Sequence, residues 1–181
     1  MKSMTTLPAS AFTRADLEAM PDDGRRHELI DGALVVTPAP SIRHQDVSLS
    51  LVLLLQQACP PEIKLLYAPV DVAFGDDTVM QPDILVAKRS DFTDRDLPVA
   101  PLLAVEILSP STRRFDLMTK RSRYEEAGTA SYWVVDPDEL TLTAWELVDG
   151  VYVEVAHVTG DDVFHATRPF PLTIRPSELG R

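Results

Sequence analysis

The segment Leu102-Leu-Ala-Val-Glu106-Ile-Leu108 is an apolar run with the length and composition of a central β-strand, and it contains a single ionisable residue. An isolated carboxylate buried in such a strand costs several kcal/mol or stays protonated. Glu106 therefore needs a partner, unless it points outward from an edge strand or forms a buried pair with an arginine. The segment predicts a sheet core that contains a partnered carboxylate.

Two further carboxylates lie on segments that resemble strands. Asp83 stands in an apolar run from Gln81 to Ala87, and Glu28 precedes the hairpin turn Asp31-Gly32. Each has an ordinary alternative, because Asp83 can cap a turn after the proline before it and Glu28 can be a solvated hairpin residue. If the three carboxylates converge, they supply the oxygen donors that a hard divalent cation such as Mg²⁺ prefers.

Apolar spacing and turn residues along the whole chain predict one sheet packed by helices, in the α/β or α+β class. We expect one domain over residues 12–170, between an N-terminal tail of residues 1–11 and a C-terminal tail of residues 171–181. The expected helices cover residues 13–20, 41–58 and 113–127, and the expected strands cover 26–30, 33–37, 63–74, 79–87, 102–108 and 131–135, with a β meander over 141–158.

The net charge of the chain limits its partners. There are 17 Lys and Arg against 28 Asp and Glu, so the formal charge is −11, which on average repels nucleic acid and anionic membranes. The longest apolar runs have about five residues, far short of the roughly 20 that span a bilayer, and no secretory signal is visible. Cys59 is the single cysteine, which excludes an internal disulfide or a zinc cage. We therefore expect a cytoplasmic protein without membrane contact.

One segment has the opposite charge. Residues 112–123 carry five basic side chains and a single acid, Asp116. Asp116, Lys120 and Tyr124 follow one another at intervals of four, so they share one face of the expected helix and can lie against the sheet. The alternative is an ordinary surface pair of Asp116 with Lys120 on a solvated helix face. The first interpretation predicts that the surface around Asp83 and Glu106 is basic.

The order of these residues resembles that of a known group of nucleases. The chain resembles the PD-(D/E)XK nuclease superfamily in having Pro82-Asp83, then Glu106 in an apolar strand, and then a basic helix. The Uma2 family is more similar still, over roughly residues 12–170. The matching segments are Glu28-Leu-Ile-Asp-Gly32, His44-Gln45, Gln81-Pro-Asp-Ile84, Val105-Glu-Ile-Leu-Ser-Pro-Ser-Thr112, Asp116 with Lys120 and Tyr124, and Gly128 before Tyr132-Trp-Val-Val-Asp-Pro137.

The resemblance implies a restriction-endonuclease-like core, in which a mixed β-sheet is flanked by helices, with an N-terminal helix and hairpin and a C-terminal meander. It also implies metal-dependent hydrolysis of DNA. Asp83, Glu106 and the backbone carbonyl of Ile107 would hold Mg²⁺ or Mn²⁺, and Glu28 would bind a second ion or a water on the metal. The superfamily has a lysine two residues after the glutamate, but this chain has Leu108 there. The resemblance implies that Lys120 takes that role.

The resemblance assigns the remaining site residues as well. It implies that His44, Asp116 and Tyr124 line the cleft, although local hydrogen bonds at a helix start also explain His44. A homodimer would allow one site per chain to cut both DNA strands. Two other functions stay open: a catalytically silent binding or assembly module that keeps this fold, and a hydrolase of a small phosphorylated molecule. The expected phosphate contacts are Arg113, Arg114, Arg121 and Arg123.

Overall fold

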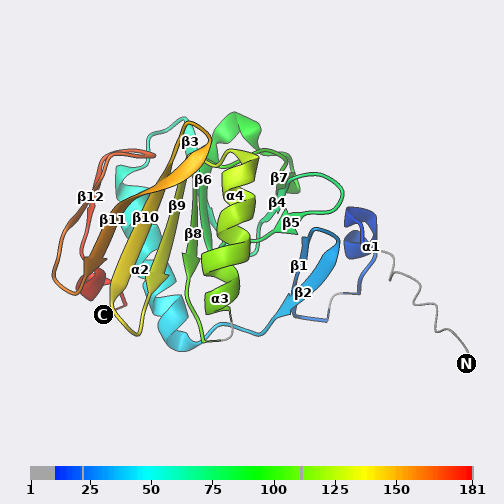
Figure 1. The fold of residues 1–181 in the computed structure, drawn as a ribbon, viewed down its shortest axis with the longest axis horizontal. Helices are drawn as coiled ribbons and strands as arrows, with labels where there is room; N and C mark the ends of the chain where they lie inside the picture. The colour runs from blue at the N-terminus through cyan, green and yellow to red at the C-terminus, as the bar shows by residue number, and fades with distance from the viewer. Residues whose placement is uncertain (1–10, 22, 111, 181) are drawn as a thin grey trace, which may run out of the picture.

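A mixed β-sheet forms the centre of the molecule (Figure 1). The structure is a computed structural model that describes residues 11–21, 23–110 and 112–180, so the expected tail of residues 1–11 lies outside it except for Ala11. Strands β8 and β9 run parallel, and the other neighbouring strands of this sheet are antiparallel. The strand order is β11 (Val151–Thr159), β10 (Thr141–Val148), β9 (Ser131–Asp136), β8 (Leu103–Ile107), β6 (Ile84–Lys88) and β3 (Ile63–Tyr67).

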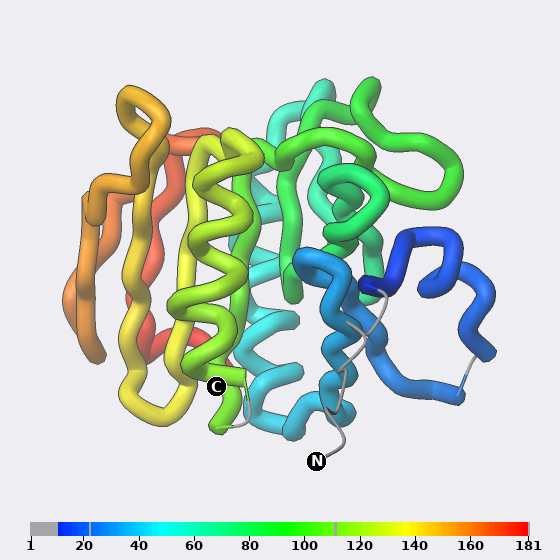
Figure 2. The backbone as a smooth tube through the Cα atoms, turned by 45° about the vertical axis from the view of Figure 1, so that its right-hand side comes forward, coloured from blue at the N-terminus to red at the C-terminus, as the bar shows by residue number. Residues whose placement is uncertain are grey.

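Helices cover both faces of this sheet (Figures 1 and 2). Helix α2 (Ile42–Ala58) begins after Ser41, whose hydroxyl accepts a hydrogen bond from the His44 backbone, and packs its apolar side on one face. The other face carries α3 (Arg113–Phe115), η2 (Asp116–Lys120) and α4 (Arg121–Ala127). Side chains alternate along a strand, so Val105 and Ile107 point toward α2 while Glu106 points toward η2.

A smaller sheet stands beside the first, in the order β2 (Ala33–Thr37), β1 (Arg26–Ile30), β5 (Val79–Met80), β4 (Asp71–Ala73) and β7 (Asp96–Leu97). Helix α1 (Arg14–Glu18) packs Leu17 against this sheet, and the short helix η1 (Arg89–Asp91) follows β6. The β1–β2 turn requires its glycine, because Gly32 has a φ of +73° and a Cβ there would lie 2.5 Å from the Cβ of Ala11. This hairpin carries Glu28 to the main sheet.

Three expected elements are interrupted in the structure. The run 63–74 forms β3 and β4, which belong to different sheets. The other two interruptions lie beside the carboxylates. The run 79–87 forms β5 and β6 separated by Gln81-Pro82-Asp83, because the proline has no N–H for a strand ladder. The helix 113–127 contains a π-helical segment, η2, which begins at Asp116 and ends at Lys120. The side chains of both residues are buried there. Single π turns of this kind are frequent at functional sites.

The end of the chain packs into the core. Residues 171–180 were expected to form a tail, but β13 (Leu172–Ile174) pairs with β12 (Phe164–Ala166), and η3 (Pro176–Glu178) follows. Ile174 and Leu179 are buried in the cluster that α2 covers. Their burial explains why this segment is ordered despite its low apolar content. In the described ranges, no helix has the length and apolar character of a membrane span.

Candidate active site

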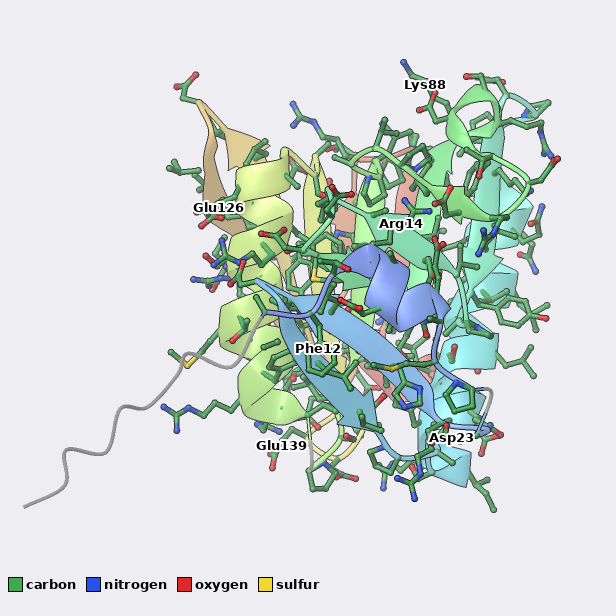
Figure 3. The ribbon with its side chains drawn as sticks, turned by 90° about the vertical axis from the view of Figure 1, so that its right-hand side faces the viewer. Phe12, Arg14, Asp23, Lys88, Glu126 and Glu139 are labelled. Carbon is green, nitrogen blue, oxygen red and sulfur yellow. The ribbon has the colours of Figure 1, made fainter. Side chains whose placement is uncertain are left out.

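A cleft of about 1030 Å³ opens where the small sheet, the start of α2 and the ends of β6 and β8 meet. Figure 3 shows the β1–β2 hairpin between the α3–α4 side and α2, on the side of the molecule that faces the viewer. Four residues expected at the site, Asp83, Glu106, Ile107 and Lys120, line this cleft, and so do His44 and Asp116. The topology therefore brings together residues that are far apart in the sequence.

Lys120 joins two of the predicted carboxylates inside the protein. Its ammonium lies 3.1 Å from Glu106 Oε1 and 2.8 Å from Glu28 Oε1, and the three side chains are at most 2% exposed. The interpretations of Glu106 as an outward edge residue and of Glu28 as a solvated hairpin residue are wrong. Buried charges of this kind are stable only when they are paired.

Burial and the charge of the partner shift the pKa values of Lys120 and Glu106 in opposite directions. Burial alone lowers the pKa of Lys120, but the charges of Glu106 and Glu28 raise it above its ordinary value. Burial raises the pKa of Glu106, and the charge of Lys120 opposes that rise. Lys120 therefore stays cationic in the absence of bulk water and remains a hydrogen-bond donor at the floor of the cleft.

Asp83 has a separate set of donors. Its Oδ1 accepts from Arg26 Nη1 at 2.9 Å, and its Oδ2 accepts from the Ile107 backbone N–H at 2.8 Å and lies 3.1 Å from His44 Nε2. Burial raises the pKa of Asp83, but the hydrogen bond with His44 and the charge of Arg26 hold it below the ordinary value. Asp83 is therefore an anion that is fixed in orientation by three groups, and it does not cap a turn.

Arg26 links the two halves of the site. Besides binding Asp83, it donates to the Gln81 carbonyl, and its Nε lies 3.7 Å from Glu28 Oε2. That Glu28 oxygen is buried, and no group in the described residues makes a hydrogen bond with it. Glu28 Oε1 accepts from the Gln81 backbone N–H at 2.7 Å. Arg26 was not among the expected site residues, because it precedes Glu28 in what resembled a solvated hairpin.

Asp116 completes the group of acids around Lys120. Its Oδ1 lies 3.9 Å from the Lys120 ammonium, and burial raises the pKa of Asp116 to about 6 against the opposing charge of Lys120. Its backbone carbonyl accepts a hydrogen bond from the Tyr132 hydroxyl at 2.9 Å. The π-helical segment thus holds both of its terminal side chains toward the sheet.

Tyr124 is the one expected cleft residue that does not reach the cleft. It is fully buried beside Tyr132, with ring centroids 5.3 Å apart, and is not part of the cleft lining. Within the described residues its hydroxyl has no hydrogen-bond partner. The four-residue spacing correctly predicted that Tyr124 faces the sheet. Tyr124 lies one helical turn beyond Lys120, however, where the helix packs on the sheet core and no longer borders the cleft.

The expected basic surface around the carboxylates is not formed, because the described cleft lining has four basic side chains against five acids. Arg113, Arg114, Arg121 and Arg123 do not line the cleft. Arg113 pairs with Asp136, the Arg121 guanidinium lies 5.2 Å from the centre of the Trp145 ring, and Arg123 pairs with Asp31 and Glu126. The arginines of the cleft are Arg25, Arg26 and Arg43. The basic run over residues 112–123 therefore did not predict which side of the helix faces the cleft.

The side chains suit a hard cation in their chemistry. In residues 11–21, 23–110 and 112–180, no three histidine, cysteine or carboxylate side chains form a group that could hold a metal ion. Asp83 and Glu106 nevertheless offer carboxylate oxygens to the cleft, and within the described residues the buried Glu28 Oε2 accepts no hydrogen bond. Arg26 and Lys120 now neutralise these carboxylates. A divalent ion at Asp83 would therefore have to replace the Arg26 contact.

Comparisons with known proteins agree with this architecture. The model of the Uma2 family, described as "Putative restriction endonuclease", matches residues 14–177. The crystal structure of a protein from Anabaena variabilis, described as "a putative nuclease belonging to DUF820", superposes with a TM-score of 0.72 at 21% identity, over 93% of this chain and 97% of that one. No curated protein matches the chain. The expected restriction-endonuclease-like fold is confirmed.

Proposed function

This chain belongs to the Uma2 family, and we propose that it is a divalent-metal-dependent endonuclease that hydrolyses phosphodiester bonds of DNA. The position of Lys120 supports this function most strongly. The chain lacks the lysine that the nuclease motif places two residues after Glu106, yet the Lys120 ammonium lies 3.1 Å from Glu106 Oε1. Burying a lysine costs desolvation free energy that an apolar residue of similar volume would avoid, so a structural role alone does not explain Lys120.

Asp83 and Glu106, with the Ile107 carbonyl, would hold Mg²⁺ or Mn²⁺, whose chemistry when bound is to acidify water and to neutralise charge on the scissile phosphate. Lys120 would donate a hydrogen bond to the attacking water or to a phosphate oxygen. Glu28 would position Lys120 through their 2.8 Å contact. His44 would keep Asp83 oriented through Oδ2. These roles need no movement of the sheet, because the groups already line or border one cleft.

The substrate is a polyanion, and three arginines of the cleft provide contacts for its phosphates. Arg25 is mostly exposed and lies 3.8 Å from Asp23, while Arg43 lies 3.6 Å from Asp138. These exposed pairs are weak and can exchange their partner for a phosphate. Binding should therefore weaken steeply as salt rises. Cutting of both strands would need two copies of the chain, so we also propose a homodimer.

A cleavage assay separates this function from its two alternatives. Supercoiled plasmid, a single-stranded oligonucleotide and bis(p-nitrophenyl) phosphate are incubated with Mg²⁺ or Mn²⁺ and wild type, Asp83→Asn or Lys120→Met. We expect wild type to cut the DNA substrates and both variants to lose activity while retaining cooperative unfolding. Hydrolysis of the small ester without any DNA cleavage would favour the small-molecule hydrolase. Absence of all hydrolysis, with no cation bound in calorimetry, would favour the silent module.

A further inference from the structure

The wall of the cleft next to Asp83 is apolar and ends in an exposed aromatic ring. Tyr67, the last residue of β3, is 63% exposed and lines the cleft. In the described residues its ring has no ring contact, and its hydroxyl makes no hydrogen bond. An exposed tyrosine without partners contributes little to folding, so its position at the cleft needs another explanation.

Strand pairing places this ring beside the carboxylate site. Tyr67 is the register partner of Ile84, the residue after Asp83, and the next residue, Ala68, donates its N–H to the Asp83 carbonyl at 2.9 Å. Successive side chains of β3 alternate, and Ile63 and Leu65 pack in the cluster beneath α2. Tyr67 therefore lies on the α2 side of the sheet, where the cleft opens.

Other apolar residues extend the wall that Tyr67 begins. Leu49 and Val52 of α2 and Pro69 after β3 also line the cleft, and Leu49 is 60% exposed. Leu53, four residues after Leu49 in α2, is 54% exposed but is not part of the lining. The cleft thus has a polar floor, where Asp83, Glu106 and Lys120 lie, and an apolar wall of aromatic and aliphatic side chains.

This combination suits an unpaired nucleotide better than a duplex. Bases that are not paired stack on exposed aromatic rings, and that contact accepts any base. A duplex keeps its bases stacked inside and binds chiefly through phosphates along a broad basic surface. Here the cleft arginines are interrupted by Asp46 and Asp138 within a chain of net charge −11. This balance of charge disfavours a duplex with its two phosphate backbones, so we infer one strand in the cleft, with its phosphate at the floor and its base on the wall.

We propose, on the basis of the nuclease function above, that the preferred substrate is single-stranded nucleic acid and that Tyr67 stacks on the base next to the scissile phosphate. Leu49 extends the base-binding wall with an aliphatic side chain. The unpaired strand can be a free single strand, an overhang or a frayed end, since all of them offer the same exposed base.

Binding in EDTA tests this proposal without any cleavage. Fluorescence anisotropy of a labelled single-stranded oligonucleotide, and of a blunt duplex of the same sequence, is measured with wild type, Tyr67→Ala, Tyr67→Phe, Leu49→Ala and Leu53→Ala. We expect wild type to bind the single strand more tightly than the duplex. Tyr67→Ala should weaken single-strand binding about 5-fold or more, the effect of losing one stacked base. Tyr67→Phe should bind like wild type, because it keeps the ring.

The two leucines are a matched pair of exposed α2 residues, so Leu49→Ala should weaken binding and Leu53→Ala should not. Equal melting temperatures of the variants would show that the fold is retained. The proposal would be overturned if Tyr67→Ala binds the single strand as tightly as wild type, or if it loses affinity equally for the duplex and the single strand. It would also be overturned if wild type prefers the duplex or does not bind the single strand. If Tyr67→Ala binds normally while wild type cuts DNA with metal, the stacking role fails and the nuclease function stands.

Discussion

The Lys120 ammonium donates a hydrogen bond to Glu106 Oε1 across 3.1 Å, from a π-helical segment on one side to the central strand β8 on the other. Both side chains are at most 2% exposed. The contact thus connects the helical layer to the sheet at the floor of the cleft. The same lysine therefore stabilises the packing of the two layers and lines the cleft.

Removal of the Lys120 charge should destabilise the fold. Lys120→Met leaves Glu106 and Glu28 buried without their shared cation, so the free energy of unfolding should fall by about 3–5 kcal/mol. The double variant Lys120→Met/Glu106→Gln should lose less than the sum of the two single changes, because the pair is coupled. Urea unfolding monitored by circular dichroism gives both values. Additive effects, or a loss for Lys120→Met below about 1 kcal/mol, would contradict the pairing.

Two neighbouring tyrosines should respond differently to loss of their hydroxyl. Tyr124 has a buried hydroxyl without a hydrogen-bond partner in the described residues, whereas Tyr132 donates to the Asp116 carbonyl at 2.9 Å. Tyr124→Phe should therefore be neutral or stabilising, and Tyr132→Phe should cost about 1 kcal/mol. Thermal unfolding of the two variants measures the difference. A larger loss for Tyr124→Phe would show that its hydroxyl has a role.

Arg26 should compete with the metal ion for Asp83. It donates to Asp83 Oδ1 at 2.9 Å, and this contact must break before a cation can take that oxygen. Arg26→Met should therefore bind Mn²⁺ more tightly than wild type in calorimetry, even though it loses a phosphate contact. Arg25→Met is the matched control, because Arg25 is 69% exposed and its Nε lies 3.8 Å from Asp23. Weaker Mn²⁺ binding by Arg26→Met would show that Arg26 supports the ion.

The contact of α1 with β7 should make stability depend on acid pH. The Thr93 hydroxyl, followed by Arg14, holds the pKa of Asp96 below its ordinary value of 3.8. Since the folded-state pKa lies below the unfolded one, the stabilisation is present above about pH 4 and is lost as the pH falls through the folded-state value. The stability difference between wild type and Asp96→Asn should shrink over that window in urea unfolding. A constant difference from neutral to acid pH would contradict this.

Most of the fold followed from the sequence, because its signals are local. The helical spacing of Val47, Leu51, Leu54 and Leu55 predicted α2, and the apolar run around Glu106 predicted β8. The π turn in the helix after β8 was not predictable, since Asp116 and Lys120 keep the spacing of an ordinary helix face. The C-terminal strand was also missed, because its burial depends on α2 from a distant part of the chain.

The site was predictable only where a residue type conflicted with its environment. Glu106 stood out because a carboxylate is rare in a buried strand. Arg26 and Arg43 gave no such signal, because arginines beside a hairpin or at a helix start are ordinary surface residues. The run of arginines after β8 was a misleading signal, because the sequence does not reveal that Arg113 and Arg123 pair with acids away from the cleft.

The rate of Mn²⁺-dependent DNA cleavage by Glu106→Gln, compared with wild type, tests the proposed function most directly. Gln has the shape of Glu and can still accept a hydrogen bond from Lys120, but it removes the charge that a cation needs. Glu154→Gln, an exposed position on β11, is the matched control. We predict cleavage by wild type and Glu154→Gln, with a fall of at least about 100-fold in Glu106→Gln. Equal cleavage rates for Glu106→Gln and wild type would contradict a catalytic site at Glu106.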